Sequence, residues 1–425
     1  MEGIRRTIPR SARRTPARQD VSQFPATPRT PASQKTIFSP ERYAPAFRSS
    51  QNEPAKIEPQ ALPPIRTGVE ALSPSPSVPT LAYAPAPLTT VRWLPAPGRD
   101  AIAAVGTGDG APDADFLSLY RVSTRGGDVS ATVARDIDHP GKVLRIASSL
   151  SSETLFVGSS DGSIRTLSLD SWETSSLETL SVMPRRAARP ELVTGVAPVV
   201  NGRVAALGGD GTFIVVDVSR CQEIGRAEMA DPVGFFDGTA VDAEAGNEVV
   251  SAGAGCEVCV WDTRIIQTGR GNVQTLGHPT PGVATRCVTT DPAQPHFVIG
   301  GTRNGELCTW DRRGTEPFPL NRVAMHDGVV WETRVVSSSK PGLLLSCGED
   351  SKVWLMDFAA AASRDSAMGS ESGEFWRSMI TQSDVRNVVG WDSALGINGI
   401  DAHPTADLYA YASDSGAVAF GCLYS

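Results

Sequence analysis

The feature that most constrains this chain is an internal repeat with a period of about 45–50 residues. Each repeat reads as a short strand with alternating residues, a turn, a second strand of small and apolar residues, a tight turn and a third strand. The clearest copies are residues 239–264, 287–313 and 333–358, and weaker copies are 89–122, 143–170, 193–218 and 397–421. Seven copies of one β unit predict a domain built by repetition.

The dipeptides between the second and third strands of these repeats are typical of hairpin turns with positive φ. They are Asp161-Gly162, Asp210-Gly211, Asn304-Gly305, Asp350-Ser351 and Ser415-Gly416. We expect two-residue turns at these points. No helical period separates the strands, so radial repetition is favoured over a parallel α/β sheet. The sequence therefore predicts an all-β fold, a seven-bladed β-propeller over residues 80–425.

A propeller has to close its ring. Residues 78–84 (VPTLAYA) precede the first repeat and read as a strand, whereas the chain ends just after a third strand. We predict that this segment supplies the outer strand of the last blade and so removes an exposed edge. Residues 359–395 form an insertion between blades 6 and 7. We expect its first half to be mobile and its second half to hold a strand or a short helix.

The first 79 residues differ in composition from the rest, because Pro, Ser, Thr, Ala and Arg dominate and large apolar residues are few. We predict that residues 1–79 are a disordered tail. They hold 12 basic and 6 acidic residues, a net charge of +6, so the −8 of the whole chain leaves −14 for residues 80–425. The tail lacks the apolar stretch of a secretory signal, and Glu2 and Asp20 argue against a transit peptide.

Other features bear on compartment and chemistry. No run of about 18 apolar residues occurs, so no membrane insertion is expected. The seven scattered cysteines favour a reducing compartment. Cys256 and Cys259 have CxxC spacing, but side chains three apart on a strand point to opposite faces, which favours packing over a metal or redox site. The Gly-rich stretch 106–110 leads into a strand and predicts a hairpin loop rather than a phosphate site. We expect no enzyme activity, no cofactor, no metal and no small-molecule substrate.

The tail carries six proline-directed dipeptides that are candidate phosphorylation sites. Their first residues are Thr15, Thr27, Thr30, Ser39, Ser73 and Ser75. Phosphorylation would turn the basic tail acidic and could switch a charge-dependent contact. Alternatively, a Pro-rich composition produces such dipeptides by chance. The arginines of the tail could touch nucleic acid weakly and without sequence preference, but the acidic body opposes extended binding.

The third strands carry a family signature. Trp261-Asp262 and Trp310-Asp311 end their strands with the same dipeptide, and other repeats keep the Asp at Asp170, Asp217 and Asp357. Three histidines stand just before first strands, at His139, His278 and His326. The chain thus resembles the WD-repeat propellers. The His–Ser/Thr–Asp–Trp tetrad of that family looks degenerate in every blade.

A narrower resemblance comes from the sixth repeat, residues 327–358, with Trp331-Glu332, Cys347, Glu349-Asp350, Trp354 and Asp357. It is similar to the sixth repeat of the nucleoporin 43 family, the small WD-repeat subunit of the nuclear pore Y-complex. The opening strand 88–97, the WDTR and WDRR endings and the segment 390–402 agree with that family, and the long tail departs from it.

This resemblance implies a non-catalytic scaffold subunit at the nuclear pore complex, in the nuclear envelope of the nucleus. The propeller would dock on a helical-solenoid nucleoporin of the Y-complex and support nucleocytoplasmic transport, with protein partners only. No loop stands apart in the sequence as a contact cluster.

Two alternatives remain. WDTR and WDRR also fit the W-D-x-R box of substrate receptors for cullin-based ubiquitin ligases, in which Arg264 and Arg313 would contact the adaptor. The acidic body would suit a chromatin-associated WD-repeat scaffold.

Overall fold

The computed structural model describes residues 79–95, 101–108, 115–125, 128–149, 153–183, 192–228, 235–240, 246–255, 257–266, 272–336, 341–367, 374–378, 380–389 and 395–423. The expected tail, with its six candidate phosphorylation sites, lies outside these residues, as do Cys256 and part of the Gly-rich stretch 106–110. The described elements belong to the compact unit Glu58–Ser425.

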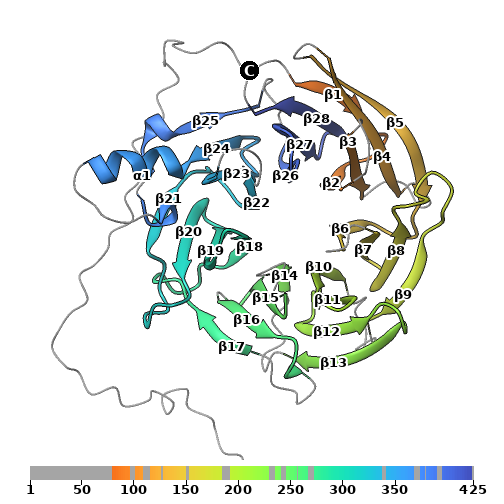
Figure 1. Cartoon of the computed structure of the whole chain (residues 1–425), viewed down its shortest axis with the longest axis horizontal. Coiled ribbons are helices and arrows are strands. Elements are labelled where there is room, and N and C mark those ends of the chain that lie inside the picture. Colours follow the sequence, from red (N-terminus) through yellow and green to blue (C-terminus); the bar gives the residue numbers. More distant parts are fainter. Residues whose placement is uncertain are drawn as a thin grey trace, which may run out of the picture. The chain divides into compact units, whose positions relative to one another are not determined.

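Seven four-stranded antiparallel sheets surround a common axis, as Figure 1 shows, and this confirms the seven-bladed propeller. Blade 1 holds β2 (Leu88–Leu94), β3 (Ala101–Thr107), β4 (Phe116–Arg125) and β5 (Asp128–Asp138). Blade 2 holds β6 (Val143–Ser148), β7 (Thr154–Ser159), β8 (Ser163–Ser168) and β9 (Glu178–Val182). Blade 3 holds β10 (Val193–Val199), β11 (Arg203–Gly208), β12 (Thr212–Asp217) and β13 (Gln222–Glu228). Blade 4 holds β14 (Phe235–Ala240), β15 (Glu248–Gly253), β16 (Val258–Asp262) and β17 (Asn272–Leu276).

The remaining blades follow the same order from the axis outward. Blade 5 holds β18 (Thr285–Asp291), β19 (Gln294–Thr302), β20 (Glu306–Asp311) and β21 (Asn321–Ala324). Blade 6 holds β22 (Val330–Val336), β23 (Leu343–Gly348), β24 (Val353–Asp357) and β25 (Val385–Asn387). Blade 7 holds β26 (Ile397–Ala402), β27 (Leu408–Ser413), β28 (Ala417–Cys422) and β1 (Thr80–Tyr83). The first repeat is therefore a full blade.

Blade 7 closes the ring with strands from both ends of the propeller sequence. β1 pairs antiparallel with β28, with Thr80 opposite Phe420 and Tyr83 opposite Ala417. This confirms the closure predicted from residues 78–84. Because β1 covers β28, the final strand of the last repeat is not left as an open edge that another chain could pair with.

The innermost strand of every blade has the same irregularity. In each, the register against the second strand shifts between the first and third residues, as between Val330 and Glu332 in β22. A β-bulge adds one residue, increases the local twist and redirects the side chains that follow it. The seven bulges therefore set the direction of the residues nearest the axis.

The five hairpin dipeptides lie where they were expected, but the turn type differs from the prediction. Only the second residue of each has positive φ, from +61° at Ser351 to +86° at Gly211. Its N–H donates to the carbonyl three residues earlier, as from Gly162 to Ser159 (3.3 Å). These are longer loops built on a β-turn that ends in a left-handed residue, rather than two-residue turns.

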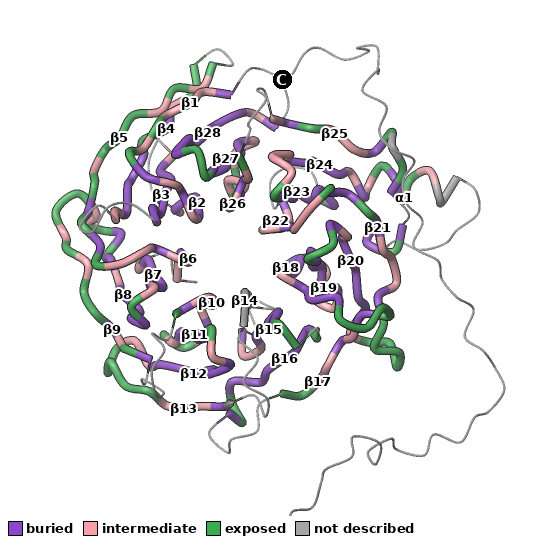
Figure 2. The backbone as a smooth tube through the Cα atoms, turned by 180° about the vertical axis from the view of Figure 1, so that it is seen from behind, coloured by how far each residue is buried: buried purple, intermediate pink, exposed green. Residues whose placement is uncertain are grey.

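The core lies between neighbouring blades. Seven clusters of buried apolar side chains occur in the described residues, and each joins one pair of adjacent blades. Blades 3 and 4, for example, meet where Phe213 stacks on Trp261 with ring centroids 5.0 Å apart. Figure 2 shows that buried positions concentrate on the inner three strands of a blade, whereas outermost strands such as β9 and β13 carry exposed residues. The stability of each blade therefore depends on both of its neighbours.

The insertion lies within blade 6, between β24 and β25, rather than between blades 6 and 7 as predicted, and it is more regular than expected. Its first part forms α1 (Phe358–Ala367), where we had expected a mobile segment. The reason is local: a run of alanines has high helix propensity, and Asp357 accepts a hydrogen bond from the N–H of Ala360 (2.8 Å) at the helix start. The second part contains η2 (Phe375–Arg377), η3 (Gln382–Asp384) and β25, which confirms the predicted short helix and strand.

Candidate interaction sites

A cavity of about 480 Å³ lies on the propeller axis. All seven blades contribute to its lining, mostly through the carboxyl ends of their innermost strands. The charged residues of its wall are Arg92, Arg145, Asp237, Arg334 and Asp401. Four prolines complete the rim, three that follow innermost strands and one, Pro198, within β10: Pro95, Pro198, Pro292 and Pro404. The cavity thus combines buried charges with apolar walls, a composition typical of a binding site.

Arg92 and Glu332 form an ion pair next to this cavity. Nη1 of Arg92 lies 3.2 Å from Oε2 of Glu332, and Nη2 contacts Oε1. Only 8% of Arg92 and 2% of Glu332 is exposed. Oε2 of Glu332 also accepts the backbone N–H of Ile400 (2.9 Å). The pair therefore joins blades 1 and 6, with blade 7 held between them.

A second ion pair repeats this arrangement on the other side of the axis. Nε of Arg145 in blade 2 lies 3.3 Å from Oδ1 of Asp237 in blade 4. Oδ2 of Asp237 accepts the backbone N–H of Val288 in blade 5 (3.2 Å). Asp237, like Glu332, thus accepts a main-chain hydrogen bond from the next blade, which satisfies part of a buried carboxylate and fixes the spacing of the blades.

Asp401 and Arg334 complete the charged wall. Oδ2 of Asp401 in blade 7 accepts the backbone N–H of Trp93 in blade 1 (2.8 Å). Burial raises the pKa of Asp401 to about 6, although the nearby Arg92 acts to lower it. Nη2 of Arg334 donates to Glu332 (2.7 Å), and its Nε lies 3.8 Å from Asp401 Oδ1. Sequence reasoning missed this ring of charges. Its only sequence signal was the charged residues within apolar first strands.

Blade 6 retains more of the structural tetrad than the sequence suggested. His326 is hydrogen-bonded through Nδ1 to Asp350 (2.8 Å) and through Nε2 to Ser346 (2.9 Å). Trp354 lies opposite Ser346 in the adjacent strand. The tetrad of blade 6 therefore keeps its His–Asp and His–Ser hydrogen bonds but stays incomplete, because the indole Nε1 of Trp354 has no hydrogen-bond partner among the described residues. In blade 5, by contrast, His278 contacts Glu306 (3.1 Å).

The two arginines of the WD-x-Arg motifs fold back on the aspartates of their own motifs. Arg264 donates from Nε (2.9 Å) and Nη2 (2.6 Å) to Asp262, and Arg313 binds Asp311 in the same way (3.0 and 2.8 Å). Hydrogen bonds from Arg313 lower the pKa of Asp311 to about 2. Arg264 keeps 64% of its side chain exposed and Arg313 keeps 50%. Each guanidinium group is therefore already hydrogen-bonded to the Asp of its own motif, although half or more of each Arg side chain remains exposed.

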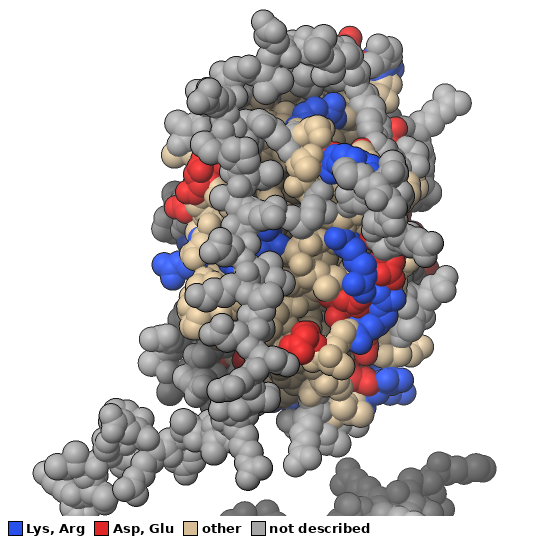
Figure 3. All heavy atoms as spheres, turned by 90° about the vertical axis from the view of Figure 1, so that its left-hand side faces the viewer, with Lys and Arg blue, Asp and Glu red and all other residues tan. Residues whose placement is uncertain are grey.

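Arg313 has further partners because the insertion folds over blade 5. Glu374, next to η2, binds Arg313 (2.8 Å) and Arg377 (2.6 Å), and Arg377 also contacts Asp311. The indole of the adjacent Trp376 is fully buried and donates to Asp291 at the end of β18 (2.9 Å). Figure 3 shows acidic and basic side chains side by side on the flank of the propeller where α1 and β21 lie. The sequence placed Trp376 in an insertion but gave no sign of its docking site.

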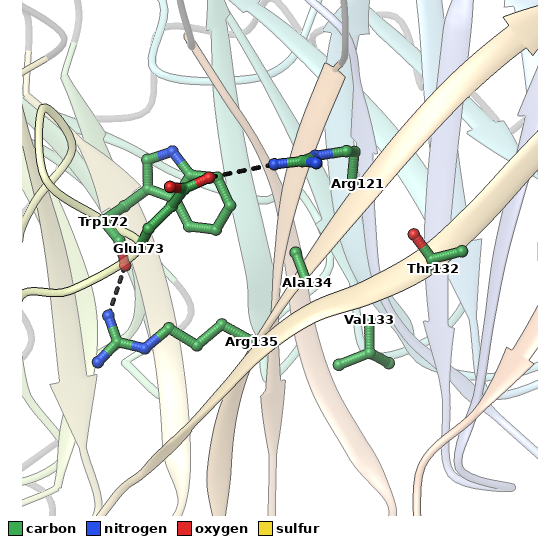
Figure 4. Close-up of a pocket in the computed structure, with 7 residues that line it drawn as sticks. All are labelled: Arg121, Thr132, Val133, Ala134, Arg135, Trp172 and Glu173. Carbon is green, nitrogen blue, oxygen red and sulfur yellow. Dashed lines mark hydrogen bonds and ion pairs between the residues drawn. The ribbon is translucent and has the colours of Figure 1, made fainter.

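A groove of about 340 Å³ lies between blades 1 and 2 on the outer side of the propeller. As Figure 4 shows, Arg121 points toward Glu173 (3.2 Å), and Arg135 of β5 donates to the carbonyl of Trp172. Val133 of β5 lines the groove with 50% of its surface exposed. The sequence showed no such cluster on a single loop, and the cluster here is assembled from two strands, β4 and β5, and the loop that follows β8.

The chemical expectations can be compared with the described residues alone. Six cysteines there are free, and no group of His, Cys, Asp and Glu among the described side chains has the arrangement of a metal site. Burial raises the pKa of Cys259 to about 11, so this thiol is poorly suited to redox chemistry. None of the described helices has the length and apolarity that a membrane span requires.

Comparison with known proteins gives two consistent matches. The Mus musculus protein "Nucleoporin Nup43" is 24% identical over 340 residues, which cover 75% of this chain and 86% of the mouse protein. The Homo sapiens protein "Nucleoporin Nup43" is 25% identical over 306 residues, which cover 67% and 77% of the respective chains. No protein-family model matches the chain.

The closed ring of seven blades, with Trp-Asp endings in blades 4 and 5, defines a WD-repeat β-propeller protein. Within that class, the two matches relate the chain to the Nup43 nucleoporins, and the resemblance drawn from the sixth repeat is confirmed. Both relatives are named nucleoporins, which are constituents of the nuclear pore complex in the nuclear envelope, and this likeness supports the same localisation for the chain. Fold and relatives together support a scaffold role.

Proposed function

We propose that the propeller is a non-catalytic scaffold subunit that docks on a helical-solenoid nucleoporin of the Y-complex and so supports nucleocytoplasmic transport. The observation that carries this proposal is the match to nucleoporins over two thirds or more of the chain, on a fold built to present surfaces to proteins. Such docking requires neither a cofactor nor a catalytic residue.

We further propose that docking uses the groove between blades 1 and 2. It combines an exposed apolar residue, Val133, with the indole of Trp172 and two arginines, the residue types that dominate binding at protein interfaces. Neighbouring outermost strands add exposed apolar side chains, with Tyr83 on β1 69% exposed and Val182 on β9 54% exposed. Large apolar groups on three consecutive blades form a surface that a helical partner could cover.

The test is affinity purification of the tagged full chain from a nuclear-envelope fraction, followed by mass spectrometry. We expect the other Y-complex subunits in near-equal amounts. Val133→Glu should remove them, because a charged carboxylate would replace an apolar side chain in the contact and would have to lose its hydration. Val273→Glu is the matched control, since Val273 is 49% exposed on the outermost strand β17 of blade 4. If the Val133 variant still recovers the complex, docking lies elsewhere; if the wild type recovers no nucleoporin, the scaffold proposal fails.

The ubiquitin-ligase alternative predicts a different set of partners. It requires Arg264 and Arg313 to contact an adaptor, yet each guanidinium is held by its own Asp and Arg313 is also held by Glu374. Recovery of a cullin and its adaptor, without outer-ring nucleoporins, would favour this alternative. Binding should then be lost in the Arg264→Ala variant. A chromatin scaffold would instead recover histones.

Phosphorylation of the tail remains a second, separate proposal. The six candidate residues lie outside the described part of the chain, so only their sequence context supports it. Phosphopeptide mapping of the purified chain would test it, and absence of phosphate at all six positions in dividing and resting cells would refute it.

A further inference from the structure

The axial cavity contains a cation whose hydrogen-bonding capacity is largely unused. Arg334 is partly buried at the cavity wall, with 19% of its side chain exposed. Among the described residues it makes one hydrogen bond, from Nη2 to Glu332 (2.7 Å). Its Nε is buried and has no hydrogen-bond partner there, since Asp401 Oδ1 at 3.8 Å is too far. A buried N–H without a hydrogen-bond partner is costly, so Nε of Arg334 can still take an acceptor.

The neighbouring carboxylates do not hydrogen-bond to Nε of Arg334, because their positions are set by the contacts that hold the blades together. Glu332 accepts from Arg92 and Ile400 as well as from Arg334. Asp237 is taken up by Arg145 and by the main chain of blade 5, and Asp401 by the main chain of blade 1. Holding the ring closed thus accounts for the side-chain contacts of Arg92 and Arg145. It leaves part of the hydrogen-bonding capacity of Arg334 unused.

The size and walls of the cavity show what kind of ligand would fit. Its volume of about 480 Å³ falls within the usual range for binding pockets and exceeds what a single small ion needs. Trp93, Val335 and the rim prolines provide apolar surface, and prolines offer no N–H that would compete with Arg334 for an oxygen. A fitting ligand therefore has an anionic end and an apolar body.

The charges favour a carboxylate over a phosphate. Three arginines face two aspartates across the cavity, with Glu332 beneath them. One added negative charge is tolerable there, particularly because Asp401 takes up a proton readily for a carboxyl group. A phosphate dianion would bring two charges close to Asp237 and Asp401. A guanidinium also pairs well with the planar carboxylate group.

We propose that the axial cavity binds the side-chain carboxylate of an extended peptide segment, with Arg334 as the principal donor and the proline rim against the peptide's apolar atoms. This site is separate from the outer groove and does not depend on which nucleoporin the propeller meets. It gives the scaffold a second contact, through its axis, for a linear segment of a partner.

The test is an NMR titration of the full chain labelled with ¹⁵N-arginine and ¹⁵N-tryptophan. The probe is N-acetyl-glutamate methylamide, and its uncharged match is N-acetyl-glutamine methylamide. The Arg334 Nε–H signal, assigned by its loss in Arg334→Lys, should shift and saturate with the glutamate probe alone. No shift, or an equal shift with the glutamine probe, would refute the site. Tighter binding of inorganic phosphate would refute its assignment to carboxylates.

Variants separate binding from folding, with the Trp93 indole signal as reporter. Arg334→Gln should lower the affinity for the glutamate probe at least about tenfold, because the charge-assisted donor is removed. Thr239→Trp keeps every charge and fills the cavity from β14, so it should also abolish binding. Arg220→Gln removes one exposed charge in a β12–β13 turn outside the cavity lining and should bind as the wild type does. If a folded Thr239→Trp variant bound the probe with wild-type affinity, the probe would not be binding in the axial cavity.

Discussion

Arg92 and Glu332 are 240 positions apart in the sequence and form a buried ion pair that connects blade 1 to blade 6 across blade 7. Blade 7 is the blade assembled from both ends of the propeller sequence, through the pairing of β1 with β28. The ring is thus closed twice, once by main-chain hydrogen bonds at its outer edge and once by side-chain charges at its axis. Both closures have measurable consequences.

We expect Arg92→Met to lower the free energy of unfolding by roughly 1–3 kcal/mol, because buried Glu332 would lose the charged hydrogen bonds from Arg92, although Arg334 would still donate to it. Arg264→Met is the control, since it breaks an Arg–Asp pair whose Arg side chain is 64% exposed and should cost less than about 1 kcal/mol. Urea denaturation of both variants measures the difference. Equal costs would show that the axial pair does not hold the ring together.

The outer closure depends on Gly416, which has φ of +77° and accepts a hydrogen bond from Ala84 (2.8 Å). A Cβ at this position would lie 2.7 Å from the carbonyl oxygen of Ala84. Gly416→Ala should therefore lower the free energy of unfolding by roughly 1–3 kcal/mol beyond the cost of placing Ala at a positive φ. Gly282→Ala supplies that reference, because φ there is +81° with open space around the Cβ. Thermal unfolding of the two variants measures the difference. Similar melting temperatures would show that the Cβ at position 416 does not disturb the outer closure.

Trp376 fastens the insertion to blade 5. Trp376→Ala should cost about 3–5 kcal/mol, because it empties a fully buried site and leaves Asp291 without the indole N–H. Trp376→Phe fills most of the volume and should cost less. Denaturation gives the energies, and limited proteolysis should show faster cleavage within residues 359–374 for the Ala variant. Unchanged cleavage would mean that other contacts hold the insertion.

Asp401 makes stability depend on pH. Burial raises its pKa to about 6 in the folded chain, against about 3.9 for a free Asp, so the folded state binds the proton more tightly. The stabilisation from this proton is complete below about pH 4 and is lost as the pH rises through 6. Asp401→Asn lacks this loss, so its stability relative to the wild type should rise by about 1 kcal/mol between pH 5 and 7.5. Denaturation at both pH values measures this, and a constant difference would contradict the raised pKa.

The repeat period, the turn dipeptides and the family resemblance were all readable from the sequence, because they are local. A hairpin needs its left-handed residue at one position, so Gly162 and Gly416 were visible as turns. The turn type was misjudged because it depends on how the flanking strands pair. The Ala-rich start of α1 shows a different error, since we gave more weight to the lack of large apolar residues than to helix propensity.

What only the tertiary structure decided is which distant residues meet. The sequence by itself determined seven β units, their hairpins and the strand that closes the ring, because alternation and turn chemistry act within a few residues. It did not determine that Arg92 pairs with Glu332, that Trp376 reaches Asp291, or that Arg334 lines the axial cavity with its Nε free of a hydrogen-bond partner among the described residues. Those relationships arise because radial packing brings seven first strands to one axis, and no local pattern encodes the order in which their charges pair.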